Sequence, residues 1–231
     1  MLRTENLSVS FGKVAALKNV TVQIESATVQ GVIGPNGAGK STLMDALSGR
    51  VKATTGHVYL DDADITTRSV TWRRRQGISR SFQRTSIFPT QTVREQLELV
   101  AGRSKATDAT EIADALGLGE VLDRVAGEIA YGDQRRVDIA LALVGNPTLL
   151  LLDEPGAGLS AAETLSLFEH VAALVKDRGV TAAIVEHDVD AVFATCDTVT
   201  VLDLGTVLAS GKPEDVRRDD RVITAYLGSA A

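Results

Sequence analysis

A glycine-rich segment with a lysine and a serine has the composition and spacing of a phosphate-binding loop. It reads G-x-x-x-x-G-K-S, an apolar run at residues 29–33 precedes it, and a helical pattern begins at its lysine. In this setting backbone N–H groups and the helix N-terminus bind phosphate, the lysine reaches the β- and γ-phosphates, and the serine hydroxyl binds Mg²⁺. The sequence therefore predicts a site for ATP and Mg²⁺. Its expected contacts are Gly34, Pro35, Asn36, Gly37, Ala38, Gly39, Lys40, Ser41 and Thr42.

Two carboxylates, Asp153 and Glu154, follow a run of four leucines at residues 149–152. Such a run is typical of a strand buried on both faces of a parallel sheet, and ligands bind where the carboxyl ends of these strands meet. We expect Asp153 to hold Mg²⁺ through its water shell and Glu154 to act as general base toward the attacking water. The alternative is an acidic helix N-terminus, where carboxylates are favoured by the helix dipole.

Alternating strand and helix patterns surround these two motifs and predict an α/β fold, a P-loop core with a parallel sheet. The predicted strands cover residues 7–11, 20–24, 29–33, 57–60, 149–152, 181–185 and 198–202, and the predicted helices cover residues 40–49, 161–177 and 189–194. The first two strands are expected to pair in an N-terminal antiparallel β subdomain. Residues 89–129 carry helical patterns only. We therefore expect a helical subdomain at about residues 85–135, inserted into a nucleotide-binding core of residues 1–84 and 136–231.

Composition narrows the class of protein. The 231 residues carry a net charge of −6, which argues against nucleic-acid binding because that function needs a basic face. The single cysteine, Cys196, excludes an internal disulfide, and no apolar run approaches the ~20 residues that cross a bilayer. We expect a cytosolic protein, or one that reaches a membrane only through a partner. The arginines at 73–75 are expected to lie on a solvated helix, with their stems over apolar surface.

With these motifs the chain resembles the ATP-binding cassette family, and three further residues stand where that family has functional side chains. The resemblance implies that Phe11 stacks on adenine, that Gln83 senses Mg²⁺ and the attacking water, and that His187 contacts the γ-phosphate. The alternatives are a core aromatic at Phe11, a solvated loop amide at Gln83 and a structural histidine at His187. The residues implied as catalytic are Glu154, His187 and Gln83, and those implied at the metal are Ser41, Gln83 and Asp153.

The family's signature, L-S-G-G-Q, has its counterpart at residues 129–133, which read I-A-Y-G-D. In that family the signature contacts the nucleotide of the other subunit in a head-to-tail dimer, which implies this role for Ala130, Tyr131, Gly132 and Asp133. Ala130 lacks the serine hydroxyl that would bind the γ-phosphate, although the helix N-terminus and the Gly132 N–H could still bind it. We call residues 129–133 the signature segment.

The resemblance covers nearly the whole chain, and residues 77–83, 87–93 and 225–228 are similar to the branched-chain amino-acid or urea importer branch. It implies an ATPase subunit at the cytoplasmic face of the plasma membrane, where ATP-driven dimer closure is coupled to permease subunits through the helical subdomain. A second ATPase subunit, identical or different, is the other implied partner. The alternatives are a regulatory cassette that hydrolyses ATP weakly, a non-transport cassette ATPase, and another phosphate-loop enzyme such as a kinase.

Overall fold

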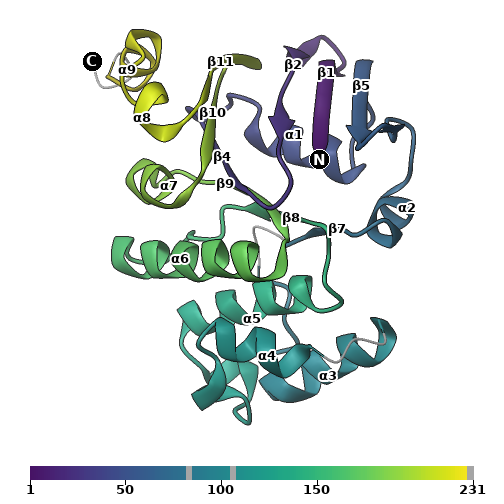
Figure 1. The fold of residues 1–231 in the computed structure, drawn as a ribbon, viewed down its shortest axis with the longest axis vertical. Helices are drawn as coiled ribbons and strands as arrows, with labels where there is room; N and C mark the ends of the chain where they lie inside the picture. Colours follow the sequence, from purple (N-terminus) through teal and green to yellow (C-terminus); the bar gives the residue numbers. More distant parts are fainter. Residues whose placement is uncertain (82–84, 105–107, 228–231) are drawn as a thin grey trace.

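The computed structural model describes residues 1–81, 85–104 and 108–227, which form two sheets with helix α1 between them (Figure 1). The first sheet is antiparallel, in the order β2-β1-β5-β6 with β3 paired to β1. Its strands are β1 (Leu2–Phe11), β2 (Val14–Val20), β3 (Gln23–Ile24), β5 (Thr55–Leu60) and β6 (Ala63–Asp64).

The second sheet has the order β11-β10-β4-β9-β8-β7, and only β11 runs antiparallel to its neighbour. Every residue of β4, β8 and β9 is buried, which explains why these strands are apolar runs rather than alternating patterns. The strands are β4 (Val29–Ile33), β7 (Ile78–Arg80), β8 (Leu149–Asp153), β9 (Thr181–Val185), β10 (Thr198–Asp203) and β11 (Thr206–Gly211).

Helices cover both faces of this second sheet. Helix α1 (Lys40–Ser48) packs with Leu149 and Leu151 of β8 on the face toward the antiparallel sheet, while Leu150 and Leu152 pack with helices on the opposite face. The helices on the opposite face are α5 (Tyr131–Leu143), α6 (Ala161–Arg178) and α7 (Val189–Thr195). Helix α2 (Val70–Arg75) precedes β7, and helices α8 (Pro213–Val216) and α9 (Asp220–Leu227) follow β11. Within the described part of the chain, no helix is long and apolar enough to cross a membrane.

The segment between β7 and α5 contains helices α3 (Val93–Ser104) and α4 (Ala109–Ala115), and two 3₁₀ turns at Gly119–Val121 and Ala126–Glu128. Figure 1 places α3, α4 and α5 together at the end of the molecule opposite the antiparallel sheet. The expectation of helical structure throughout residues 89–129 is therefore only partly right. The backbone between α4 and α5 turns back on itself, and a bridge between Thr92 and Val125 closes the segment.

The strand predictions at 29–33 and 181–185 match β4 and β9 at both ends. The prediction at 20–24 is wrong, because β2 ends at Val20 and the chain forms a separate short strand at Gln23–Ile24. Register shifts in the pairing of β1 with β2 interrupt the alternation that marks a regular strand. Strands β6, β7 and β11 and helices α8 and α9 were not predicted.

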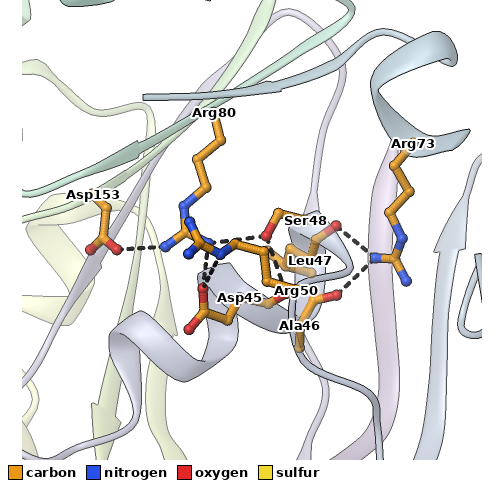
Figure 2. Close-up of polar contacts among 8 residues, drawn as sticks. All are labelled: Asp45, Ala46, Leu47, Ser48, Arg50, Arg73, Arg80 and Asp153. Atoms are coloured by element: carbon orange, nitrogen blue, oxygen red, sulfur yellow. Dashed lines mark hydrogen bonds and ion pairs between the residues drawn. The ribbon is translucent and has the colours of Figure 1, made fainter. Parts of the chain in front are cut away.

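The prediction of a solvated face is also wrong for Arg73, whose side chain is 1% exposed, although Arg74 and Arg75 are exposed. Its Nη1 donates to the carbonyl oxygens of Ala46 and Leu47, both at 2.7 Å, at the C-terminal end of α1 (Figure 2). Burial lowers the pKa of the guanidinium to about 10, so it stays charged at neutral pH. A cation at this position is favoured by the helix dipole and binds carbonyl groups of the last helical turn, of which that of Ala46 also accepts from the Gly49 N–H.

Candidate active site

The glycine loop, residues 34–41, joins the end of β4 to the start of α1. Two of its glycines are required by close packing: a Cβ on Gly34 would lie 2.1 Å from the Leu202 carbonyl oxygen, and one on Gly39 would lie 2.7 Å from that of Ala16. Gly37 has a φ of +79°, a conformation that favours glycine, and nothing lies within 4 Å of its Cβ position. The loop is thus fixed from below and open above Gly37.

Lys40 is the first residue of α1, and its buried side chain folds back over the loop. Its Nζ donates to the carbonyl oxygens of Gly34 at 2.7 Å and Pro35 at 3.1 Å. Burial lowers the pKa of Lys40, while the nearby charges of Glu154, Asp153 and Glu186 raise it. The residue before α1 is a glycine, and the first turn of the helix contains no carboxylate. The positive end of the helix is therefore available to an anion.

The carboxylates lie at the end of β8, beside the end of β9. Asp153 pairs with Val185 in parallel register, and the Glu154 N–H donates to the Val185 carbonyl at 2.8 Å. Glu154 has a φ of +50°, a left-handed conformation that costs about 1–3 kcal/mol for a non-glycine residue and is found mainly at functional sites. Its Oε1 lies 2.9 Å from Nε2 of His187. The parallel register of β8 with β9 and the left-handed backbone at Glu154 thus bring together Glu154, the predicted general base, and His187, the predicted γ-phosphate contact.

A hollow of about 210 Å³ lies over the glycine loop. The predicted residues that line it come from the loop and from the residues that follow β8 and β9. Its lining consists of Ala16, Asn36, Gly37, Ala38, Gly39, Lys40, Ser41, Thr42, Glu154 and His187. Gly34, Pro35 and Asp153 are outside this lining, since Gly34 and Pro35 form the base of the loop and Asp153 is buried.

Asp153 is held by a residue that the sequence analysis did not single out. Nη2 of Arg80 donates to Asp153 Oδ2 at 2.7 Å (Figure 2), while Oδ1 is buried and has no hydrogen-bond partner among the described residues. An oxygen of this kind is suited to a donor such as the water shell of a divalent cation. The arrangement fits the Mg²⁺ role predicted for Asp153. A lone arginine on a short strand carries no pattern that would reveal this contact.

The aromatic side chain of Phe11, at the end of β1, is 54% exposed, so the alternative of a core aromatic is wrong. The β1–β2 hairpin that carries Phe11 also supplies Ala16 to the lining of the hollow. An exposed ring on this hairpin is free to stack on a planar base. Gln83, the other residue implied by the resemblance, lies outside the described residues.

Residues 17–157 match the ABC transporter family, and residues 206–231 match a family described as branched-chain amino acid ATP-binding cassette transporter. The chain belongs to the ABC transporter family. It is 36% identical to LivG, the high-affinity branched-chain amino acid transport ATP-binding protein of Escherichia coli (strain K12), over 251 residues that cover 100% of this chain and 98% of LivG. Membership makes it a nucleotide-binding protein and an ATPase.

Two solved ABC cassettes have the same fold over nearly their whole length. An ATP-binding cassette in its ADP conformation superposes with a TM-score of 0.89 at 33% identity, covering 99% of this chain and 98% of the other. A dimeric bacterial ABC transporter cassette superposes with a TM-score of 0.79 at 26% identity, covering 92% of this chain and 99% of the other. The predicted α/β fold with an N-terminal antiparallel sheet is therefore confirmed.

The signature segment of this ABC cassette leads into α5, whose first residue is Tyr131. Ala130 precedes the helix and provides no side-chain cap, and no residue of the segment lines the hollow. A Cβ on Gly158 would lie 2.9 Å from the Tyr131 ring, so the ring packs against the loop that leads to α6. The structure thus separates the segment from the nucleotide loop of its own chain.

Two further buried side chains near Glu154 were missed by sequence reasoning. Arg135, one turn into α5, donates to the carbonyl oxygens of Glu154 at 2.5 Å and Pro155 at 3.2 Å. Glu186, at the end of β9, is 5% exposed, and burial together with the charge of Glu154 raises its pKa to about 7. Glu186 stands between a buried strand and His187, which is the one sequence signal that could have drawn attention to it.

Proposed function

We propose that the chain is the ATP-hydrolysing subunit of an importer for branched-chain or other small amino acids. The observation that carries the proposal is the contact of Glu154 with His187 over the glycine loop, because the side chains that would serve as base and as γ-phosphate contact line one hollow. The amino-acid substrate is supported by the LivG likeness and by the match of residues 206–231 to the branched-chain family. An intact Glu154–His187 pair favours hydrolysis over the alternative of a regulatory cassette.

In this proposal the loop N–H groups and Lys40 bind the ATP phosphates and Phe11 stacks on the adenine. Glu154 accepts the proton of the attacking water while His187 fixes the orientation of the Glu154 carboxylate and reaches the γ-phosphate. Ser41, Asp153 and Gln83 would hold Mg²⁺. When bound, Mg²⁺ would neutralise charge on the phosphate oxygens.

A second copy of the cassette, or a related one, completes the site. The hollow of about 210 Å³ is smaller than the ~300–1,000 Å³ typical of sites that enclose a small molecule, which supports a site shared between two subunits. Ala130, Tyr131, Gly132 and Asp133 would then contact the partner's nucleotide through the positive end of α5. Permease subunits would dock on the helical subdomain, about residues 85–135, and hold the chain at the cytoplasmic face of the plasma membrane.

Glu154→Gln tests this proposal, because the amide keeps the shape of the side chain and cannot accept a proton. In a permease complex purified with the tagged chain, we expect ATP binding to remain and ATP hydrolysis and leucine uptake to fall by about 10²–10⁴-fold. The isolated Glu154→Gln chain should form a dimer with ATP in size exclusion. Glu169→Gln, at an exposed position on α6 outside the proposed docking surface, is the matched control and should behave as wild type. Wild-type turnover in Glu154→Gln would rule out Glu154 as the general base. Uptake that does not depend on ATP would rule out ATP-driven import by this complex.

A further inference from the structure

Beneath the glycine loop, Arg80 connects Asp153 to the far end of α1 (Figure 2). Its Nη2 donates to Asp153 Oδ2 at 2.7 Å, and its Nη1 donates to Asp45 Oδ1 at 2.6 Å and to Ser48 Oγ at 3.0 Å. The Arg80 and Asp153 side chains are 10% and 7% exposed, so solvent screens their ion pair far less than a surface pair. The Asp153 carboxylate is therefore held firmly on one side.

The backbone of Arg80 is fixed as well. Arg80 ends β7 in parallel register with Leu151, two residues before Asp153, and the following Ser81 N–H donates to the Leu151 carbonyl at 3.0 Å. Asp45 and Ser48 lie in the second half of α1, the helix that carries Lys40 and Ser41 at its other end. A planar guanidinium can bridge two carboxylates in this way, whereas an ammonium acts as a single point charge.

Only one of the two Asp153 oxygens is used in this network. Oδ1 is turned away from Arg80 (Figure 2), is buried, and has no hydrogen-bond partner among the described residues. A carboxylate fixed through one oxygen presents the other in a defined direction. Outer donors of this kind orient carboxylates at metal sites, and their loss typically lowers metal affinity by about 10–100-fold.

We propose that Arg80 is a positioning residue, which orients Asp153 so that Oδ1 is presented to the Mg²⁺ that accompanies the bound nucleotide. The inference rests on the Mg²⁺ role of Asp153 in the proposed function. Asp45 and Ser48 anchor the guanidinium, so that the orientation of Asp153 is tied to the same helix that positions Lys40 and Ser41. Arg80 itself does not line the hollow over the glycine loop.

The test measures equilibrium binding of a fluorescent ATP analogue to the full chain while Mg²⁺ is titrated, with EDTA as the metal-free reference. For Arg80→Met we expect unchanged affinity in EDTA and a rise of about 10–100-fold in the Mg²⁺ concentration that gives half of the affinity gain. Arg178→Met is the matched control, because Arg178 bridges Asp108 at 3.0 Å and Glu111 at 2.9 Å on α4 and its N-terminus, away from the hollow. It should leave the Mg²⁺ midpoint at the wild-type value.

Arg80→Lys keeps the positive charge but loses the planar guanidinium that donates to two carboxylates, so we expect an Mg²⁺ midpoint between those of wild type and Arg80→Met. This variant provides the test if Arg80→Met does not fold. A wild-type or lower midpoint in the Arg80 variants, or an equal rise in Arg178→Met, would overturn the positioning role. If the wild-type chain itself shows no gain in affinity with Mg²⁺, the proposed metal site fails instead. The two failures are therefore distinguishable in one titration.

Discussion

Glu186 is a buried carboxyl group next to the candidate general base. Its Oε2 has no hydrogen-bond partner among the described residues, and the charge of Glu154 adds to the effect of burial in raising its pKa to about 7. A hydrogen bond from the Gly156 backbone and the charge of Arg135 act in the opposite direction but do not cancel this effect. Near neutral pH the group is thus partly protonated, which limits the negative charge packed around Glu154.

At the residue scale this predicts a pH-dependent stability that Glu186→Gln removes. The pKa rises from 4.5 to about 7 on folding, so the folded state keeps a proton that the unfolded state releases. The resulting stability is fully present below pH 4.5 and is lost as pH rises through about 7, by up to about 3 kcal/mol. Relative to wild type, the free energy of unfolding of Glu186→Gln should therefore be higher at about pH 8 than at about pH 5.

Urea unfolding of both proteins at the two pH values checks this prediction. Glu169→Gln, at an exposed position on α6, is the matched control and should follow the wild-type pH dependence. If Glu186→Gln loses stability between the two pH values as steeply as wild type, Glu186 does not hold the proton.

At the scale of elements, α1 is held at both ends by groups distant in sequence. Its N-terminus follows a glycine loop that Leu202 and Ala16 carbonyls confine, and its C-terminus receives the buried guanidinium of Arg73. Arg73 also donates from Nη2 to the Ile65 carbonyl at 2.7 Å, which ties the chain before α2 to the same helix end. The helix that presents Lys40 and Ser41 is thereby fixed between the two sheets.

We expect Arg73→Met to lower the free energy of unfolding by about 3 kcal/mol, because it removes five hydrogen bonds to backbone carbonyl groups and takes the guanidinium donor from the buried Leu47 carbonyl. Arg75→Met, at an exposed position on α2 beside Arg73, should change the free energy of unfolding by no more than about 0.5 kcal/mol. Urea denaturation of the two variants measures both values. Equal stabilities would show that water replaces the guanidinium at these carbonyls and that Arg73 is not a structural cap.

The features that the sequence predicted well, buried strands and the motifs that follow them, are those that a pattern of neighbouring residues reveals. Residues 149–152 are apolar throughout, and residues 29–33 are apolar except for Gln30, because their strands are buried on both faces. The motifs that follow them lie at the carboxyl ends of the strands as expected. Strand β7 has three residues and is a strand only through its pairing with β8, some 70 positions later. The contacts of Arg73 and Arg80 likewise join positions 27 and 73 apart, and no local pattern reports such partners.

At the scale of the whole molecule, the nucleotide loop and the signature segment of one chain do not line the same hollow. The hollow is lined by residues of the glycine loop, β2, Glu154 and His187, whereas Ala130 to Asp133 begin α5 outside that lining. A dimeric cassette is among the solved structures with this fold. These observations support a head-to-tail dimer, in which each site takes its loop from one subunit and its signature segment from the other.

Mixing two inactive variants tests this arrangement. Lys40→Ala removes the phosphate-binding lysine, and Gly132→Leu fills the signature segment; a Cβ at Gly132 meets its nearest atoms at 3.6 and 3.7 Å, so this position has room in the fold. Each variant alone should be inactive, because both of its sites carry a defect. A mixed dimer has one site with both defects and one with none, so equal mixing should restore about a quarter of the wild-type ATPase rate if dimers form at random. Phosphate release from the mixture is compared with that of each variant alone. A mixture no faster than its parents would mean that the loop and the signature segment of the same chain act together, or that this cassette pairs only with a different one.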